Sequence, residues 1–135
     1  MDPIVVIGAG AAGIFAALRA AEILENGGSG SFASKVILLE KTNRIGTKIL
    51  ISGGGKCNVA HDGPLEDVIR SFRPNEARFI RHACYRLTNK QIIEFFTSRG
   101  LRVYTRPNGR VFPIDQTAKD VVAILQQELD LHKID

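Results

Sequence analysis

The segment VVIGAGAAG, residues 5–13, decides the predicted fold of this chain. It starts within an apolar run at residues 4–7, which is typical of a short strand buried on both faces of a parallel sheet. An alanine-rich stretch from residue 11 to about residue 24 follows, and its composition favours a helix. Three glycines with the spacing G-x-G-x-x-G span the junction of the strand and the helix: Gly8, Gly10 and Gly13. In this strand-to-helix context the spacing indicates a dinucleotide-binding turn.

Each glycine of this turn has a distinct physical role in such a site. Gly8 allows the tight turn out of the strand, Gly10 lets a pyrophosphate approach the backbone, and Gly13 lets the helix pack closely on the sheet. Backbone amides at the helix start, including those of Ala11 and Ala12, would bind the pyrophosphate with the helix dipole behind them. A glycine-rich turn without a ligand is the competing interpretation.

A second apolar run, residues 36–39, ends at Glu40 and completes the pattern of one right-handed βαβ unit. The connection ENGGSGSFAS, residues 25–34, is rich in glycine and serine, so we expect a flexible loop there. The carboxylate of Glu40 would accept hydrogen bonds from both hydroxyls of an adenosine ribose. It would also repel a 2′-phosphate, which disfavours NADP. A solvated acid is the competing interpretation for this residue.

The composition limits the class of protein. The chain has 135 residues, of which 44% are hydrophobic and 24% charged, and this balance indicates one globular domain. No apolar run reaches the length of a transmembrane helix, and the start MDPIVVIGAG has no features of a secretory signal. Two cysteines, Cys57 and Cys84, make no disulfide framework. We therefore expect a reducing compartment, the cytoplasm or the interior of an organelle, and no membrane partner.

A local group of basic residues lies beyond the βαβ pattern. The net charge of the chain is +4, and five arginines gather in one window with a single opposing acid, Glu76. A nucleic-acid surface is one interpretation of this group. A solvated helix face or a contact with another segment is favoured, so no nucleic-acid partner is expected. The arginines are Arg70, Arg73, Arg78, Arg81 and Arg86.

Residues 61–135 are predicted to be mostly helical, with one short β-hairpin. Residues 75–87 have the apolar spacing of a helix, with Ile80, Cys84 and Leu87 on its buried face. Thr88 and Gln91 form a capping box for a second helix, which Gly100 ends. The segments LRVYT and GRVFP are predicted strands around a turn at residues 107–109. Thr117 and Asp120 cap a last helix, whose buried face carries Val121, Leu125 and Leu129, and no further strand is predicted after it.

Residues 40–58, EKTNRIGTKILISGGGKCN, carry a second glycine motif. With the GAGAAG start, this segment resembles the BaiN/RdsA-like family of FAD/NAD(P)-binding oxidoreductases, whose signature is close to R-x-G-x-K-x-x-x-S-G-G-G-[KR]-C-N. The resemblance continues through GLRVYTRPNGRVFP to the last helix. The chain departs from the R-x-G-G-R-x-x-[ST] motif of the wider flavoprotein superfamily, because Thr47 and Lys48 replace its second glycine and second arginine. The matching positions are Arg44, Gly46, Lys48, Ser52, Gly53, Gly54, Gly55, Lys56, Cys57 and Asn58.

The resemblance implies FAD as the cofactor and NAD(P)H as a candidate electron donor of a full-length oxidoreductase with an unknown small-molecule substrate. It implies that the three consecutive glycines bring the main chain against the flavin, although a flexible loop is the competing interpretation. Lys56 would stabilise the negative charge of a reduced flavin, and Asn58 would bond a carbonyl. We also predict that Lys41, next to Glu40, binds the cofactor.

We predict structural or surface roles for Cys57 and the three histidines. A lysine neighbour would lower the pKa of the Cys57 thiol, but no C-x-x-C motif exists, so a small packed residue beside the flavin is favoured. The three histidines have no ligand spacing, so no metal site is proposed; they are His61, His82 and His132.

The predicted fold is α/β but incomplete. It comprises a Rossmann-like FAD-binding βαβ unit with its flavin loop in residues 1–60, and the helical and hairpin continuation in residues 61–135. Only two runs have the character of buried parallel strands, whereas sheets of this class have about five or six. We therefore expect weak FAD binding, no turnover by these residues alone, and self-association through an uncovered sheet surface. The alternatives are a truncated, non-catalytic nucleotide-binding fragment and an NAD-binding dehydrogenase fragment.

Overall fold

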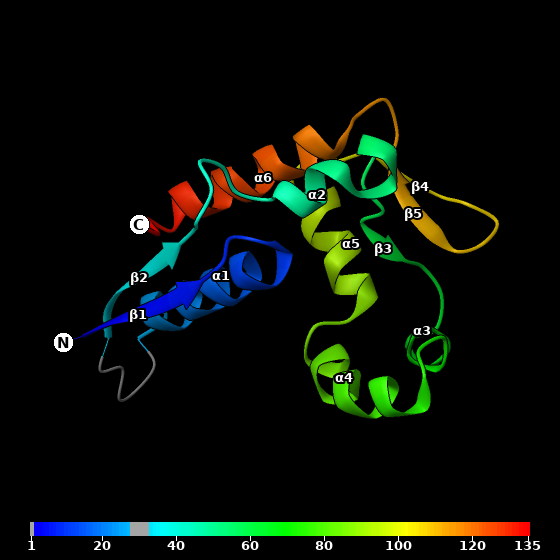
Figure 1. The fold of residues 1–135 in the computed structure, drawn as a ribbon, viewed down its shortest axis with the longest axis horizontal. Helices are drawn as coiled ribbons and strands as arrows, with labels where there is room; N and C mark the ends of the chain where they lie inside the picture. The colour runs from blue at the N-terminus through cyan, green and yellow to red at the C-terminus, as the bar shows by residue number, and fades with distance from the viewer. Residues whose placement is uncertain (1, 28–32) are drawn as a thin grey trace. The chain divides into compact units, whose positions relative to one another are not determined.

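The computed structural model describes residues 2–27 and 33–135, and packing divides the chain into two compact units (Figure 1). The first unit contains the residues up to Ile51 together with Lys119–Asp135. The second unit is Ser52–Ala118. Of the flexible loop predicted at residues 25–34, residues 28–32 lie outside the described residues. Within the described ranges, no helix is both long enough and apolar enough to cross a bilayer.

The first unit contains the predicted βαβ pattern. Strand β1 (Asp2–Ile7) is followed by helix α1 (Ala11–Glu25) and strand β2 (Ala33–Leu39). The two strands are parallel and in register, with Val5 opposite Ile37 and Ile7 opposite Leu39. Figure 1 shows them side by side, and the Rossmann-type fold predicted from the glycine turn is confirmed.

The two strands are covered on one face only. Val36 is buried and Val6 is half-buried on the face toward α1, because side chains alternate along a strand and paired residues share a face. On the other face Ile7 is 84% exposed, and Val5 and Leu39 are also exposed. The prediction that both runs are buried on both faces is therefore wrong for the described chain. Burial on both faces requires helices on both sides of the sheet, and a sequence pattern alone does not supply them.

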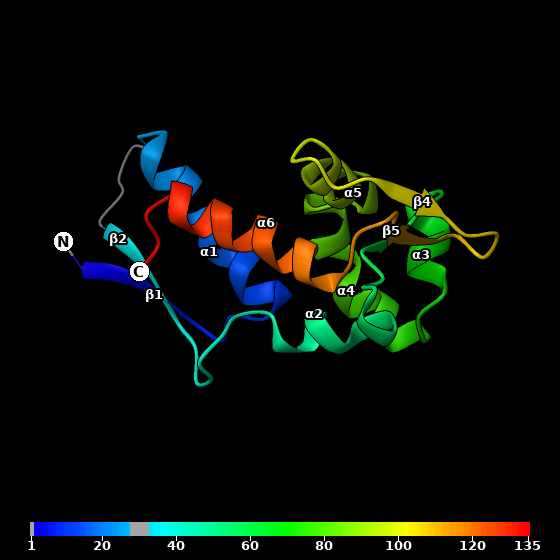
Figure 2. The same ribbon diagram turned by 90° about the horizontal axis from the view of Figure 1, so that it is seen from above.

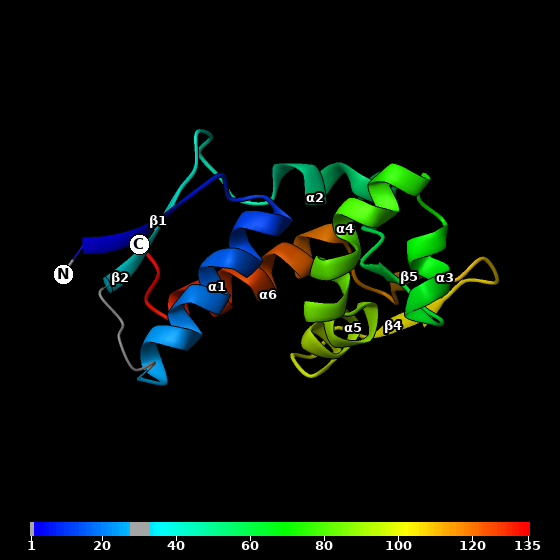
Figure 3. The same cartoon turned by 90° about the horizontal axis from the view of Figure 1, so that it is seen from below.

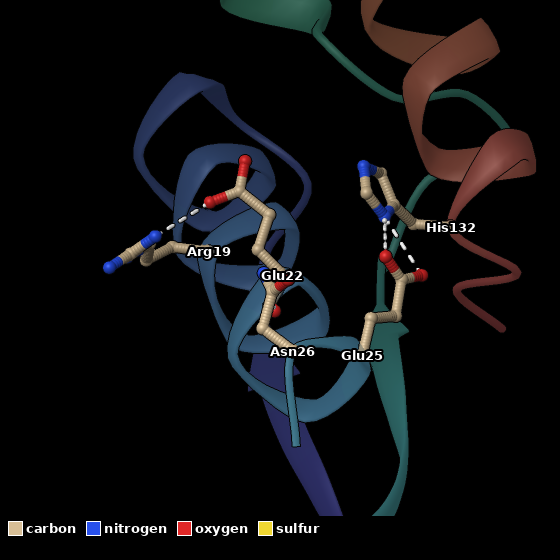
Figure 4. A network of polar contacts seen from close by, with 5 residues as sticks. All are labelled: Arg19, Glu22, Glu25, Asn26 and His132. Carbon is tan, nitrogen blue, oxygen red and sulfur yellow. Dashed lines mark hydrogen bonds and ion pairs between the residues drawn. The ribbon is translucent and has the colours of Figure 1, made fainter. Parts of the chain in front are cut away.

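Helix α6 (Ala118–Leu131) packs in the first unit from Lys119 onward. Its predicted buried residues Val121, Leu125 and Leu129 are all buried, which confirms the predicted face. Helices α1 and α6 run in similar directions in Figure 2. His132, just beyond α6, contacts Glu25 at the end of α1 with 3.0 Å between Nδ1 and each carboxylate oxygen (Figure 4).

The residues after α6 turn back to the sheet (Figure 3). The N–H of Leu38 donates to the carbonyl of Asp135 at 2.6 Å, and the N–H of Asp135 donates to the carbonyl of Val36 at 3.2 Å. This pair of bonds is the pattern of a parallel bridge opposite Ile37. The described residues after α6 form no further strand, which agrees with the prediction, although the backbone of Asp135 occupies the edge of β2 opposite β1.

The second unit combines short helices with a three-stranded antiparallel sheet in the order β3-β5-β4. The predicted hairpin is confirmed, with Val103 opposite Pro113. Three elements of this unit were not predicted: the 3-10 helix η1, strand β3 and helix α3; helix α2 (Thr47–Ile51), at the end of the first unit, was also missed. In chain order the elements of the second unit are η1 (Ser52–Gly55), β3 (Ala60–His61), α3 (Leu65–Arg70), α4 (Pro74–Arg86), α5 (Asn89–Thr97), β4 (Val103–Thr105) and β5 (Arg110–Pro113).

Helix α5 begins at the predicted capping box. The N–H of Gln91 donates to Thr88 Oγ1 at 3.2 Å, and the N–H of Thr88 donates to Gln91 Oε1 at 2.9 Å. These reciprocal bonds satisfy two backbone donors at the helix start. Gly100 follows the helix with a φ of 88°, a left-handed conformation that favours glycine. Both local predictions are confirmed.

Helix α4 differs from its prediction in burial. It spans Pro74–Arg86, close to the predicted residues 75–87, but it has no buried residue. Ile80 and Cys84 are half-buried and Leu87 is exposed, while Phe79 on another face is 88% exposed. The predicted face of α4 is therefore only partly buried, and the prediction of a buried face is wrong. Among the described elements, α4 packs closely only on α3.

Candidate functional site

The glycine turn of the first unit leaves the start of α1 open. Gly8 has a φ of 96°, and its N–H donates to the carbonyl of Leu39 at 2.7 Å, which ties the turn to the end of β2. Gly10 is the N-cap, and no side chain caps the helix. Ala11 and Ala12 are exposed, and a Cβ added at Gly10 would meet no atom within 4 Å. Unsatisfied amides at the start of a 15-residue helix therefore face open space, as an anion-binding turn requires.

Gly13 is required by the packing of this turn. A Cβ at this position would fall on the carbonyl oxygen of Gly8, and it would lie 3.6 Å from Val6 Cγ1. The clash is with the backbone of the turn, so it cannot be relieved by moving a side chain. The predicted role of Gly13, close approach of the helix to the sheet, agrees with this geometry.

Glu40 lies at the end of β2 and bonds directly to the glycine turn. The N–H of Ala9 donates to Oε2 at 2.8 Å, and the N–H of Thr42 donates to Oε1 at 2.8 Å. The Thr42 hydroxyl also donates to Oε1, at 3.0 Å. The N–H groups of Thr42 and Ala9, followed by the Thr42 hydroxyl, lower the pKa of Glu40, so the side chain stays ionised at neutral pH. A carboxylate has about four acceptor positions, and these three donors occupy three of them, which leaves capacity for about one further donor such as a ribose hydroxyl.

Three basic residues of the predicted site follow Glu40 closely in the sequence. Lys41, Arg44 and Lys48 are exposed, and none of them has an ion-pair partner among the residues that the structure describes. The loop that carries the first two is ordered by the Thr42 hydroxyl, whose single proton is shared between Glu40 Oε1 and the carbonyl oxygen of Arg44, which lies 2.9 Å away. These cations and the open amides of α1 together favour a diphosphate, whereas the Glu40 carboxylate favours neutral hydroxyl donors.

Gly46 has a structural role that its place in the family signature does not reveal. Its N–H donates to the carbonyl of Ala9 at 2.8 Å, so this amide is used within the protein. Its φ is 67°, and a Cβ here would lie 2.8 Å from Val122 Cγ2 on α6. Sequence reasoning missed Ala9 and Thr42, which connect Glu40 and Gly46 to the turn. The only feature of the sequence that could have indicated Ala9 and Thr42 is their position, because each lies within two residues of a predicted site residue.

The glycine triplet in the second unit adopts a left-handed backbone. Gly53, Gly54 and Gly55 have φ values of 57°, 68° and 85° in the short helix η1. A run of left-handed residues is costly for any residue with a Cβ, which explains why three glycines occur in succession. A Cβ at Gly53 would lie 2.9 Å from Phe112 Cε1, whereas a Cβ at Gly54 would meet no atom within 4 Å. Gly53 is therefore held by packing, and Gly54 faces open space.

Of the three residues after the triplet, Cys57 is buried, whereas Lys56 and Asn58 are exposed. Cys57 is only 5% exposed, and burial raises the pKa of its thiol despite a hydrogen bond with Ser52. The favoured interpretation, a small packed residue rather than a reactive thiol, agrees with this burial. The amide nitrogen of Asn58, oriented toward its acceptors, donates to the carbonyls of Ala60 at 3.0 Å and Val111 at 3.2 Å. Lys56 is exposed and has no ion-pair partner within the described part of the chain.

The predicted site residues thus form two groups, one in each unit. Seven of the ten predicted residues of the first unit gather around the glycine turn and its bonded loop: Gly8, Gly10, Ala11, Ala12, Gly13, Glu40 and Gly46. Those of the second unit form the left-handed loop from Ser52 to Asn58. In residues 2–27 and 33–135, no group of three or more His, Cys, Asp or Glu side chains is arranged to hold a metal ion.

Comparison with known proteins identifies relatives over nearly the whole chain. The family described as HI0933-like protein Rossmann domain matches residues 2–135. A ribosomal RNA dihydrouridine synthase of Haemophilus influenzae is 31% identical over 93% of this chain and 28% of its own length. A 3-dehydro-bile acid delta(4,6)-reductase of Clostridium scindens is 31% identical over 99% of this chain and 30% of its own length. A ribosomal RNA dihydrouridine synthase of Escherichia coli is 29% identical over 93% and 28%. The chain spans less than a third of the length of these relatives.

Proposed function

Because the chain belongs to the HI0933-like Rossmann-domain family, we propose that it is the FAD-binding portion of a flavin-dependent oxidoreductase. The fold is that of a nucleotide-binding domain in a family with oxidoreductase relatives. One observation carries the step to a bound dinucleotide. The Glu40 carboxylate is bonded to the Ala9 N–H, immediately before the uncapped start of α1.

The residues of the first unit fit the ADP part of FAD. The amides of Ala11 and Ala12 would bind the pyrophosphate, and Lys41 and Arg44 would neutralise its charge. Glu40 would accept a hydrogen bond from a ribose hydroxyl at its remaining acceptor position. This assignment follows from the open space at Gly10 and from the ionised state of Glu40.

The residues of the second unit would hold the flavin part. The open side of Gly54 and the left-handed backbone of its neighbours would allow the ring system to approach the main chain. When bound, FAD supplies hydride transfer, and the protein orients it and adjusts its charge. Lys56 would provide a positive charge beside the reduced ring. Asn58 would act by anchoring the loop, since its amide nitrogen already donates to two carbonyls.

The substrate is the part of the function on which the relatives differ. Their names refer to a ribosomal RNA in two cases and to a bile acid derivative in the other. These substrates share no recognition chemistry, so we place the common function in the cofactor. NAD(P)H as the electron donor and a small-molecule substrate belong to the same proposal for the longer protein.

A second candidate function is nucleotide binding without turnover by these residues alone. The exposed side chains of Val5, Ile7 and Leu39 favour it, because they leave one sheet face uncovered in the described chain. Self-association through that face would then accompany weak binding. Titration with ADP and with FAD separates the two candidates, since only the flavin site gives FAD a higher affinity than ADP.

The ribose assignment predicts a specific dependence on the 2′-hydroxyl. In the unsubstituted protein, 2′-deoxy-ADP should bind about tenfold more weakly than ADP, because one hydrogen bond to an ionised acceptor is lost. In Glu40→Gln this difference should shrink severalfold, while the amide oxygen of the new side chain can still accept from Ala9. Isothermal titration calorimetry of both ligands measures the two ratios.

A matched control is Glu25→Gln, which changes an acid at the other end of α1. This variant should keep the full discrimination between ADP and 2′-deoxy-ADP. If Glu40→Gln keeps it as well, Glu40 does not hold the ribose.

The charge of Lys56 predicts an effect on the reduction potential of bound flavin. Removing a cation near the ring destabilises the reduced anion, so Lys56→Met should lower the midpoint potential by about 30 mV for a two-electron couple. Spectroelectrochemical titration at saturating FAD measures this shift. Lys90→Met, which removes another exposed lysine of the second unit, is the control. Equal potentials in both variants would make Lys56 a solvated surface charge.

A further inference from the structure

Arg106 lies at the β4–β5 turn, outside every group of residues that the sequence predicted as functional. Its backbone is fixed, because its N–H donates to the carbonyl of Arg110 at 2.8 Å and its own carbonyl accepts from Gly109 at 2.8 Å. The side chain is half-buried, and its guanidinium carbon lies 3.9 Å from the centre of the Phe112 ring. Both the backbone and the side chain of this arginine are thus held in one place.

The Phe112 ring links Arg106 to the glycine triplet within the second unit. Phe112 is only 3% exposed, and its Cε1 atom is the atom that a Cβ at Gly53 would meet at 2.9 Å. Arg106 stacks on the face of this ring, and Gly53 lies next to the Cε1 atom of the same ring. The guanidinium therefore stands beside the loop to which we assign the flavin.

The guanidinium of Arg106 is poorly satisfied for a half-buried cation. Its Nε donates to the Tyr104 hydroxyl at 3.4 Å, and no carboxylate pairs with it among the described residues. Arg99 provides the comparison, since it stacks on Phe95 at the same 3.9 Å. Unlike Arg106, it donates from its terminal nitrogen Nη1 to the Phe95 carbonyl at 3.0 Å and to the Ser98 hydroxyl at 3.3 Å. The terminal nitrogens of Arg106 thus have donor capacity that the described chain does not use.

We propose that Arg106 is a further cofactor-binding residue, which holds the negative charge of a reduced flavin on the Gly53–Gly55 loop. The inference rests on the proposed function. A guanidinium presents two parallel N–H donors, which match the adjacent nitrogen and carbonyl oxygen of the flavin's pyrimidine edge. The ring of Phe112 orients this fork before the ligand binds, whereas the exposed Lys56 has no such support. Arg106 therefore adds a positive charge of fixed position to the one that Lys56 would supply.

The test compares Arg106→Met with Arg106→Lys and with the control Arg99→Met. In Arg106→Met the affinity for reduced FAD should fall at least tenfold more than the affinity for oxidised FAD, which lowers the midpoint potential by about 30 mV for a two-electron couple. The affinity for ADP should not change, because ADP lacks the flavin. Arg106→Lys keeps the charge and should restore at least half of the shift. Arg99→Met should leave the potential unchanged.

Three results would overturn the inference. The first is an unchanged potential in a folded Arg106→Met protein, and the second is a shift in Arg106→Lys as large as in Arg106→Met, which would identify the stacking rather than the charge. Circular dichroism and the thermal midpoint of each variant establish folding. The third is no binding of FAD by the unsubstituted protein, which would overturn the proposed function at the same time. Normal FAD binding with no effect at Arg106 would overturn this inference alone.

Discussion

Gly13→Val is expected to destabilise the first unit strongly. The new Cβ would fall on the carbonyl oxygen of Gly8, so α1 must move away from the sheet or the turn must open. Overpacking of this kind typically costs about 1–3 kcal/mol, and a clash with fixed backbone belongs at the upper end or above. Because domains are stable by only about 5–15 kcal/mol, a large share of that stability is lost. Urea denaturation followed by far-ultraviolet circular dichroism measures the change.

Gly10→Val is the matched control for this prediction. Gly10 belongs to the same turn, but its φ is −81° and a Cβ there would meet no atom within 4 Å. This variant should therefore stay folded, and it should bind ADP at least tenfold more weakly because the valine occupies the space proposed for the pyrophosphate. A Gly13→Val protein as stable as Gly10→Val would show that the close approach of α1 to the turn is not needed.

Gly54→Val is expected to remove the contribution of the flavin ring to binding. A side chain at Gly54 would enter the open space that we assign to the ring, so FAD should bind no more tightly than ADP. The left-handed φ of 68° adds a strain of about 1–2 kcal/mol for a residue with a Cβ, which lowers stability but leaves the unit folded. The ratio of the dissociation constants of ADP and FAD, measured by flavin fluorescence and calorimetry, reports the effect directly.

Gly100→Val separates strain from the loss of a binding surface. Gly100 has a φ of 88°, and a Cβ there also would meet no atom within 4 Å. It lies in the same unit but follows α5, away in sequence from the proposed flavin loop. The two variants should lose similar stability, and only Gly54→Val should lose the preference for FAD. An intact preference in Gly54→Val would make the triplet a loop without a ligand.

Several elements were predictable because neighbouring residues encode them. The spacing of Gly8, Gly10 and Gly13 after an apolar run predicted the turn, since each glycine answers a local steric need. The capping box at Thr88 and Gln91 predicted the start of α5 through bonds that span three residues. Such signals act over a few positions, so they can be recognised without knowing the fold.

Other features of the site depended on residues that are distant in the chain. Nothing near Gly46 indicates that its N–H bonds Ala9 or that Val122 excludes a side chain there. The amide nitrogen of Asn58, oriented toward its acceptors, donates to the carbonyl of Val111, more than fifty positions later, and nothing near Asn58 in the sequence indicates this bond. The burial predicted for Ile7 failed for the same reason, because an apolar strand is buried only where another element covers it.

The sequence by itself determined the βαβ unit, the acid at the end of its second strand and the family to which the chain belongs. These follow from local steric requirements and from residue types at fixed spacing. Only the tertiary structure decided that Gly53 is packed while Gly54 is open, and that Arg106 stacks on the ring beside them. Gly53 and Phe112 are separated by most of the second unit, and their contact exists because the β-hairpin places that ring against the triplet. The spacing of residues reflects steric requirements within a segment, whereas tertiary packing determines which distant side chain contacts that segment.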